Sequence, residues 1–291
     1  MPILSFINEQ SLFEHWSLIQ GNRLLQYGQS MKIGSLCTGY GGLDVAVEAY
    51  FNAETIWCAE YDKHASKVIK ERFGYINYKD IKTIKWDEVP AVDILTAGYP
   101  CQPFSVAGNR KGEDDARHIW PYIKDAIRTI RPRWVIMENV KGHLSLGFEQ
   151  VLRDLASIGY DARWEIVRAA EVGAPHHRRR LFIVAYPSHR SATHDGQVQE
   201  LGRGFTPCSD MHMQDPPQEM DQGRVTAQFV EYMMGLPAGW VTDIDVPRNQ
   251  HYKILGNGVV PQQAYQALKT ICDPIHIPHT EIIEDATHEG I

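Results

Sequence analysis

Short apolar runs alternate with amphipathic segments along most of the chain. Runs typical of buried strands lie at residues 31–37, 55–59, 92–97, 134–137, 164–167 and 181–185. Apolar residues at helical spacing predict helices at residues 43–51, 63–73, 117–130, 148–157, 228–234 and 261–271. This alternation is typical of an α/β fold with a mostly parallel sheet and helices on both faces. Ligands of such sheets bind beyond the carboxyl ends of the strands.

The pattern also predicts how the chain is divided. Residues 1–186 are expected to form the main domain, with a helical extension at the N-terminus. Residues 187–224 are polar and lack periodicity, which is typical of a linker or a small inserted region. Residues 225–272 are expected to return to the main domain, and residues 273–291 to form a mobile tail.

Composition narrows the class of protein. The chain of 291 residues has five cysteines and no C-x-x-C pair, so we expect neither a disulfide framework nor a metal site. It contains no long apolar run and no secretory leader pattern, so we expect a cytoplasmic protein without a membrane span. The net charge of -7 argues weakly against a nucleic-acid partner, but the basic run at Arg178, Arg179 and Arg180 leaves a basic cleft open.

A glycine-rich turn separates the first predicted strand from the first predicted helix. The turn reads Thr38-Gly39-Tyr40-Gly41-Gly42, and glycines there let the backbone pass close to a ligand. The second strand ends at Glu60, where an acidic residue commonly binds ribose hydroxyls. The turn fits a dinucleotide, adenosylmethionine or a simple tight turn, and Glu60 fits a solvated strand end equally well.

A cysteine and a carboxylate follow two of the apolar strands. Cys101 comes after the strand at 92–97, and Glu138 comes after the strand at 134–137. If these strands are neighbours, both side chains lie across one cleft, where a nucleophile beside an acid is a chemical pair. The alternatives are a half-buried structural cysteine and a capping or surface carboxylate.

The segment Pro175 to Arg180 is predicted to be extended, with alternate residues on alternate faces. His176, Arg178 and Arg180 would then share one face, opposite His177 and Arg179. Arginines facing a cleft can clamp a phosphate or a base carbonyl. A solvated basic surface is the alternative.

The five segments described above, at 38–42, 58–60, 98–105, 138–140 and 175–180, resemble in this order the cytosine-5 DNA methyltransferases, and the resemblance covers residues 33–268. The strongest match is Gly98-Tyr99-Pro100-Cys101-Gln102-Pro103-Phe104-Ser105, and further matches are Glu138-Asn139-Val140, the loop 108–117, and residues 229–237 and 256–260. The resemblance implies a Rossmann-like class I methyltransferase fold, with 187–224 as a small target-recognition region. It also implies that the loop 108–117 closes over DNA.

The resemblance implies methyl transfer from S-adenosylmethionine to carbon 5 of a flipped-out cytosine in duplex DNA. The catalytic residues would be Cys101, Glu138, Arg178 and Arg180. The cofactor-binding residues would be Cys37, Gly39, Gly41, Gly42, Leu43, Glu60, Tyr61, Asp80, Pro100 and Asn257. The DNA-binding residues would be Gln102, Ser105 and Arg117, with Arg190 and Arg203 as candidates for base contacts in the variable region.

Two positions depart from the family pattern, and three alternatives stay open. His176 stands where the family usually has glutamine, and Cys37 stands where it usually has phenylalanine. The alternatives are a tRNA substrate, a catalytically silent DNA-binding relative, and an unrelated α/β enzyme with a cysteine nucleophile. We expect a monomer on DNA in a bacterial cell or a phage-infected host, with a paired restriction endonuclease left open. The shortness of 187–224 predicts a target of roughly two to four base pairs.

Overall fold

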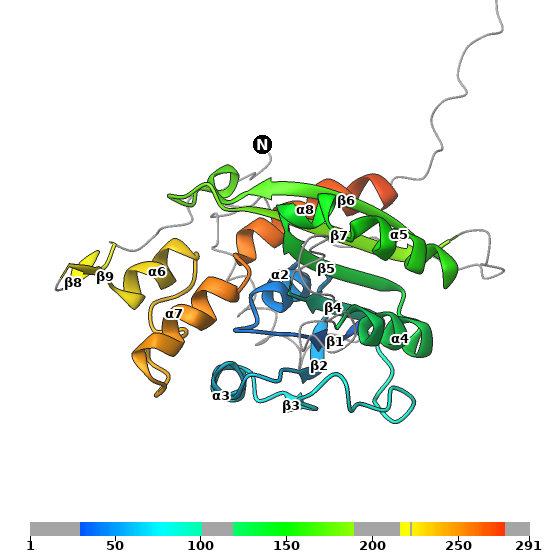
Figure 1. Cartoon of the computed structure of the whole chain (residues 1–291), viewed down its shortest axis with the longest axis horizontal. Helices are drawn as coiled ribbons and strands as arrows, with labels where there is room; N and C mark the ends of the chain where they lie inside the picture. Colours follow the sequence, from blue (N-terminus) through cyan, green and yellow to red (C-terminus); the bar gives the residue numbers. More distant parts are fainter. Residues whose placement is uncertain (1–29, 101–118, 189–215, 222, 277–291) are drawn as a thin grey trace, which may run out of the picture.

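A seven-stranded sheet forms the centre of the molecule in the computed structural model, which describes residues 30–100, 119–188, 216–221 and 223–276 (Figure 1). The strand order is β3-β2-β1-β4-β5-β7-β6. The strands are β1 Lys32–Leu36, β2 Glu54–Ala59, β3 Ile76–Asn77, β4 Ile94–Gly98, β5 Trp134–Val140, β6 Tyr160–Arg168 and β7 Arg179–Pro187. Strands β1 to β5 pair in parallel, while β7 is antiparallel to both β5 and β6. The expected mostly parallel sheet is confirmed.

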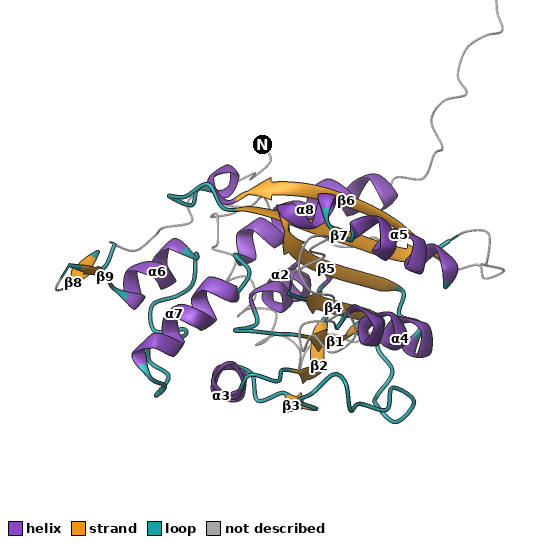
Figure 2. Cartoon of the chain, in the orientation of Figure 1, coloured by secondary structure: helices purple, strands orange, loops and turns teal. Residues whose placement is uncertain are grey.

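Helices cover both faces of this sheet (Figure 2). Helices α2 Gly42–Phe51 and α8 Pro261–His276 pack on one face, and α4 Trp120–Ile130 and α5 Phe148–Ser157 pack on the other. Strand β5 shows why its sequence is apolar without alternation. Trp134 and Ile136 join the core under α2 and α8, whereas Val135 and Met137 join the core under α4 and α5. A strand buried on both faces needs apolar residues at every position.

A third apolar cluster lies beside the sheet. It joins α3 Lys63–Arg72 to α6 Ala227–Met233 and α7 Arg248–Asn257, and it includes the buried Tyr40 of the glycine-rich turn. The carboxylate of Glu231, 1% exposed, accepts hydrogen bonds from the backbone of Gly239, Val241 and Thr242. This cluster therefore ties the chain after residue 224 to the start of the first βα unit.

Several elements differ from the sequence prediction. Strand β5 continues through Val140 because it pairs with β7 as far as Arg180, so Glu138 lies within the strand and not after it. Strand β6 runs over 160–168 and not only 164–167, because polar residues face outward along this edge strand. Helix α8 continues to residue 276, beyond the expected end at 271.

Helix α7 was absent from the sequence prediction. Only two of its residues, Ile254 and Leu255, are buried, so its sequence carries no apolar stripe. The short elements η1 Lys141–Ser145, η2 Ala169–Val172, β8 Met220–Asp221 and β9 Arg224–Val225 were also not predicted. Strands β8 and β9 form a small hairpin at the end of the 187–224 region. The proposed recognition role of that region otherwise concerns residues outside the described ranges.

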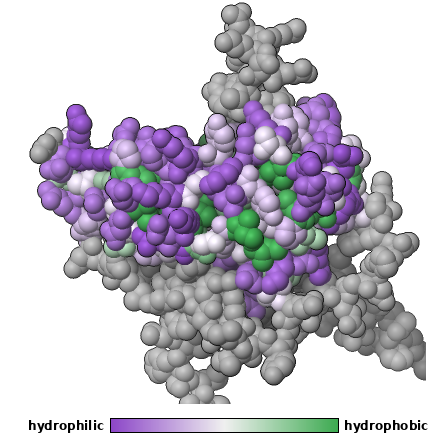
Figure 3. Space-filling model, turned by 90° about the horizontal axis from the view of Figure 1, so that it is seen from below, coloured by the Kyte–Doolittle hydropathy of each residue, from purple (hydrophilic) through white to green (hydrophobic). Residues whose placement is uncertain are grey.

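The apolar side chains on the surface of the described residues are scattered along the chain. Where the face in Figure 3 shows described residues, apolar patches are small and separated by hydrophilic side chains. Within the described ranges, none of the helices combines the length and the apolar character needed to cross a bilayer.

Candidate active site

The carboxyl ends of four parallel strands meet at one edge of the sheet. Leu36 of β1 pairs with Ala59 of β2 and with Ala97 of β4. Gly98 of β4 pairs with Glu138 of β5, which confirms that the two strands are neighbours. The chain reaches Cys101 three residues after Gly98. Glu138 therefore lies on the strand next to the one that leads toward the nucleophile candidate.

Part of the predicted site falls outside the described residues. These residues are Cys101, Gln102, Ser105, Arg117, Arg190 and Arg203. Their assigned roles stay predictions, as does that of Pro100, which is exposed just beyond β4.

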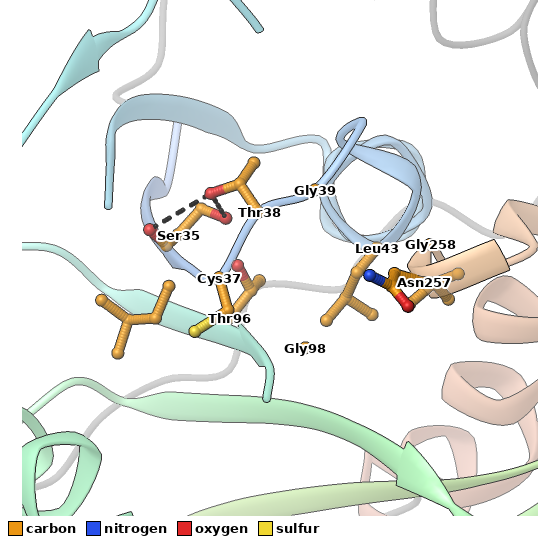
Figure 4. Close-up of a pocket in the computed structure, with 11 residues that line it drawn as sticks. Ser35, Cys37, Thr38, Gly39, Leu43, Thr96, Gly98, Asn257 and Gly258 are labelled. Atoms are coloured by element: carbon orange, nitrogen blue, oxygen red, sulfur yellow. Dashed lines mark hydrogen bonds between the residues drawn. The ribbon is translucent and has the colours of Figure 1, made fainter. Parts of the chain in front are cut away.

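A pocket opens at this edge between β1, β4 and the segment after α7 (Figure 4). Four of the predicted cofactor residues line it: Cys37, Gly39, Leu43 and Asn257. Its other lining residues are Ser35, Leu36, Thr38, Thr96, Gly98, Gly258 and Val259. The pocket therefore joins the glycine-rich turn to the end of α7, which is more than 200 residues away in the sequence.

The three glycines of the turn have different structural roles. Gly39 has a φ of +61° and open space where a Cβ would stand. No side chain therefore separates its backbone from the pocket. A Cβ on Gly41, whose φ is +84°, would lie 2.4 Å from the Phe73 ring. A Cβ on Gly42 would lie 2.2 Å from the carbonyl oxygen of Val259. Gly41 and Gly42 thus allow close packing behind the pocket and do not line it.

Among the remaining predicted cofactor residues, Glu60 contacts this turn directly. Glu60 is 8% exposed, and its carboxylate accepts the N–H groups of Gly39 (2.8 Å) and Asp62 (2.7 Å). Burial raises the pKa of Glu60 above its ordinary value. Tyr61 is 77% exposed, and the half-buried Asp80 accepts the backbone N–H of Lys82. Tyr61 and Asp80 stand outside the pocket wall, and their cofactor roles stay predictions.

Glu138 forms a buried ion pair with Arg180. The Arg180 Nε atom lies 2.7 Å from Oε1 of Glu138, and their side chains are 16% and 8% exposed. Burial raises the pKa of Glu138 to about 7, although Arg180 and Arg178 act to lower it. This carboxyl group can therefore hold or release a proton near neutral pH, which is the property required of a general acid or base.

The predicted alternation along 176–180 is present, since His176, Arg178 and Arg180 are half-buried while His177 and Arg179 are exposed. Arg178, however, donates to the carbonyl oxygens of Gly256 (2.9 Å) and Gly258 (2.6 Å). These glycines flank Asn257, so Arg178 holds the segment that closes the pocket. Its assignment as a catalytic residue stays a prediction, and the described contacts give it a positioning role.

His176 connects the segment 176–180 to α6. Its Nδ1 lies 3.4 Å from the backbone nitrogen of Arg178, which donates to it. The other ring nitrogen, Nε2, therefore carries the hydrogen and donates to the carbonyl oxygen of Met233, 2.9 Å away. Where the family usually has glutamine, this imidazole makes two hydrogen bonds.

The backbone just before Cys101 is held by two residues of β5 and η1. The Asn139 side chain donates to the carbonyl oxygen of Tyr99 (3.2 Å). The Tyr99 hydroxyl lies 2.9 Å from Nε2 of His143, whose Nδ1 faces the carbonyl oxygen of Leu146 at 2.9 Å. A carbonyl can only accept, so Nδ1 carries the hydrogen and the Tyr99 hydroxyl donates to Nε2. Neither Tyr99 nor His143 was singled out by the sequence patterns.

The sequence patterns also missed a buried carboxylate beneath the pocket. Asp44 of α2 is 1% exposed and accepts hydrogen bonds from Ser35 and Thr96, both of which line the pocket. One signal was available: Asp44 directly follows the apolar Leu43 on a helix with few exposed positions. In the described ranges, no group of three or more His, Cys, Asp or Glu residues could hold a metal ion.

Comparison with known proteins identifies the family to which this chain is similar. A family model described as C-5 cytosine-specific DNA methylase matches residues 31–224. Type II methyltransferase M.Bsp6I of Bacillus sp. (strain RFL6) is 35% identical over 165 residues, which is 54% of this chain and 52% of that protein. Type II methyltransferase M.HhaI of Haemophilus parahaemolyticus is 33% identical over 156 residues, 52% of this chain and 47% of that protein. The chain spans about half the length of the curated relatives it matches.

Solved structures share the fold. The crystal structure of S. pombe Dnmt2 methyltransferase superposes with a TM-score of 0.64 at 17% identity, covering 85% of this chain and all (100%) of the other. Entamoeba histolytica methyltransferase EhMeth gives a TM-score of 0.62 at 17% identity, covering 86% of this chain and 100% of the other. At this identity the similarity concerns the arrangement of helices and strands.

Proposed function

This chain belongs to the C-5 cytosine-specific DNA methylase family, and we propose that it transfers a methyl group from S-adenosylmethionine to carbon 5 of a cytosine in duplex DNA. The observation that carries the proposal is the buried Glu138–Arg180 pair, in which Glu138 lies on β5, next to the strand that leads toward Cys101. The names of the curated relatives support the same reaction class.

The pocket residues fit the proposed cofactor. Gly39 leaves its backbone open to a ligand, and the carboxylate of Glu60, bonded to Gly39, is suited to ribose hydroxyls. Asn257 supplies an amide at the opposite wall. When bound, S-adenosylmethionine supplies an electrophilic methyl group on a positively charged sulfur.

We assign the nucleophile to Cys101. Its thiolate forms a bond to carbon 6 of the cytosine, and the electrons of the carbon 5–carbon 6 double bond then make carbon 5 nucleophilic enough to take the methyl group. A base then takes the proton from carbon 5, the electrons of that C–H bond re-form the carbon 5–carbon 6 double bond, and the Cys101 sulfur departs as a thiolate. Because the reacting atoms lie inside a base pair, the cytosine must first be flipped out of the duplex.

Glu138 acts on the ring nitrogen N3, where negative charge develops during the addition of sulfur. In its protonated form the carboxyl group donates a hydrogen to N3, and a raised pKa near 7 keeps that form populated. Arg180, bonded to Glu138, also offers N–H groups to the base carbonyl. Arg178 supports the reaction indirectly, because it holds the backbone on both sides of Asn257.

The proposal is tested with methyl-labelled S-adenosylmethionine and three substrates: duplex DNA, tRNA and no nucleic acid. We expect label on DNA alone. Label on tRNA alone would move this chain to the alternative substrate, and binding of DNA without transfer would make it a silent relative. Cys101→Ser should retain less than about a tenth of the wild-type turnover, because a hydroxyl is far less ionised than a thiol.

Covalent trapping gives an independent test of the nucleophile. Duplex DNA with 5-fluorocytosine cannot lose the carbon 5 substituent as a proton, so the wild-type chain should remain attached to it. Cys101→Ser should form no adduct. Adduct formation by the serine variant, or its absence with an active wild type, would refute the assignment of Cys101.

The proposed partner is duplex DNA, bound by a monomer of this chain. Action in the cytoplasm of a bacterial cell or a phage-infected host, and pairing with a restriction endonuclease, stay predictions. Sedimentation of the chain with a short duplex measures the stoichiometry directly.

A further inference from the structure

Three hydroxyl groups of the pocket wall are linked to one carboxylate behind it. The Thr96 hydroxyl donates to Oδ1 of Asp44 (2.6 Å), and the Ser35 hydroxyl donates to Oδ2 (2.9 Å). The Thr38 hydroxyl oxygen lies 2.9 Å from that of Ser35. Ser35, Thr38 and Thr96 line the pocket, whereas Asp44 is 1% exposed on α2. The carboxylate therefore acts on the pocket through these hydroxyls.

The direction of these hydrogen bonds decides what the wall can offer a ligand. A hydroxyl has a single hydrogen to donate. Ser35 and Thr96 donate theirs to Asp44, so the Ser35 oxygen can only accept from Thr38. With Asp44 ionised, all three hydrogens point within the wall, and the oxygens can present only lone pairs to a ligand.

The residues that line the pocket contribute no positive charge of their own, although the Arg178 guanidinium donates to the carbonyl oxygen of Gly258. Among the described residues that line it there is no lysine or arginine. A second carboxylate, that of Glu60, accepts the N–H of Gly39 at the rim of the pocket. Two carboxylates and a set of lone pairs favour a positively charged ligand over a neutral one of the same shape.

We propose that Asp44 is a specificity-determining residue, which makes this pocket prefer the sulfonium compound S-adenosylmethionine over its neutral thioether product, S-adenosylhomocysteine. This inference rests on the proposed function. The two compounds share the adenosine, the carboxylate and the amino group. They differ by one methyl group and by the positive charge on sulfur. The negative charge of Asp44 therefore attracts S-adenosylmethionine more strongly than S-adenosylhomocysteine. A wall of this kind helps the product leave after each turnover.

The protonation of Asp44 sets the strength of this preference. Burial raises the pKa of Asp44 to about 7, and Glu48 on the same helix adds to the rise. The other titratable groups that interact with Asp44 are the Cys58 thiol and the Tyr75 phenol, and burial raises the pKa of both, so they stay neutral between pH 6 and 8. A protonated Asp44 donates a hydrogen to the wall and loses its charge. The preference should therefore weaken as the pH falls from 8 to 6.

The test is equilibrium binding of both compounds to the full chain by calorimetry. At pH 8, where most Asp44 carboxyl groups are ionised, we expect Asp44→Asn to weaken S-adenosylmethionine binding about fivefold or more, because a buried charge is removed, while S-adenosylhomocysteine binding changes less than about twofold. The control is Glu48→Gln, which removes a carboxylate that is 0% exposed on the same helix. Glu48 accepts hydrogen bonds from Thr55 and Tyr75, which do not line the pocket. Removal of its charge favours the ionised form of Asp44, so in this control the affinity ratio at pH 8 should not fall below that of the wild type.

Equal losses of both affinities in Asp44→Asn would overturn the inference, because they would indicate a structural role only. Unchanged affinities would overturn it as well. If Asp44→Asn does not fold, the test is the ratio of the two affinities in the wild type, measured at pH 8 and at pH 6. A ratio that is the same at both pH values would refute the role of Asp44. A wild type that bound neither compound would refute the proposed function, whereas binding of both with an unaltered ratio refutes this inference alone.

Discussion

Glu138→Gln separates the two properties of the carboxyl group that the proposed reaction uses. The carboxamide keeps the shape of the side chain and can still donate a hydrogen bond to N3, but it cannot transfer a proton or ionise. The change lies in β5, where Glu138 pairs with Phe182 of β7. It therefore alters the chemistry at the sheet edge with little change in volume.

The size of the pH effect follows from the pKa of Glu138, which burial raises to about 7. The carboxyl group is then about nine-tenths protonated at pH 6, about half protonated at pH 7 and about one-tenth protonated at pH 8. The contribution of protonated Glu138 to the rate should therefore decline about tenfold from pH 6 to pH 8. In Glu138→Gln this decline should be absent, and turnover at pH 7 should be lower by about 10² to 10⁴, the usual contribution of general acid–base catalysis.

The assay is single-turnover transfer of labelled methyl to duplex DNA between pH 6 and pH 8.5. As the pH increases, the thiolate fraction of the nucleophile grows while the protonated fraction of Glu138 falls. The wild-type rate should therefore first increase with pH and then level off or decline. Only the rise should remain in Glu138→Gln. Glu165→Gln is the matched control, because Glu165 on β6 pairs with the same Phe182 but is exposed. A decline at high pH that persists in Glu138→Gln would show that another group titrates, and would refute the role given to Glu138.

Three further predictions concern the base, the catalytic loop and the target. Arg180→Ala should reduce transfer to DNA strongly and Arg179→Ala much less, since Arg179 is exposed on the opposite face; equal losses would contradict this face assignment. Tyr99→Phe should lower kcat while KM for the cofactor stays constant. Its control is Tyr160→Phe, which removes a buried hydroxyl that donates to a carbonyl at the opposite edge of the sheet. The control should lower only the free energy of unfolding, by about 1 kcal/mol. Bisulfite mapping of treated plasmid DNA should show a target of roughly two to four base pairs, and methylation confined to one long site would refute a short-target role for residues 187–224.

The local pattern of residues was sufficient for the α/β class and for the edge that carries the site. Strands buried on both faces must be apolar throughout, so their positions could be predicted along the chain. The ligand edge followed from chain direction, because the segments after parallel strands meet at the same side of the sheet. The alternation of His176, Arg178 and Arg180 also followed locally, since it depends only on an extended backbone.

Features with weak local signals were less predictable. Helix α7 has only two buried apolar residues, Ile254 and Leu255, and its polar surface resembles a loop in sequence. The extension of β5 to Val140 depends on its pairing with β7, which is a distant segment of the chain. Helical and strand periodicity report burial along one element and contain no information about which element lies beside it.

The functional assignments of single side chains depended on tertiary contacts. The positioning contacts of Arg178 are an example, because its guanidinium donates to Gly256 and Gly258, which lie about 80 positions further along the chain. Asp44 meets Thr96 only because β1 and β4 are adjacent in the sheet and α2 packs across them. A hydrogen bond is directional and requires two particular atoms within about 3 Å. Local sequence determines which donors and acceptors each element carries, and only the packing of those elements decides which of them meet.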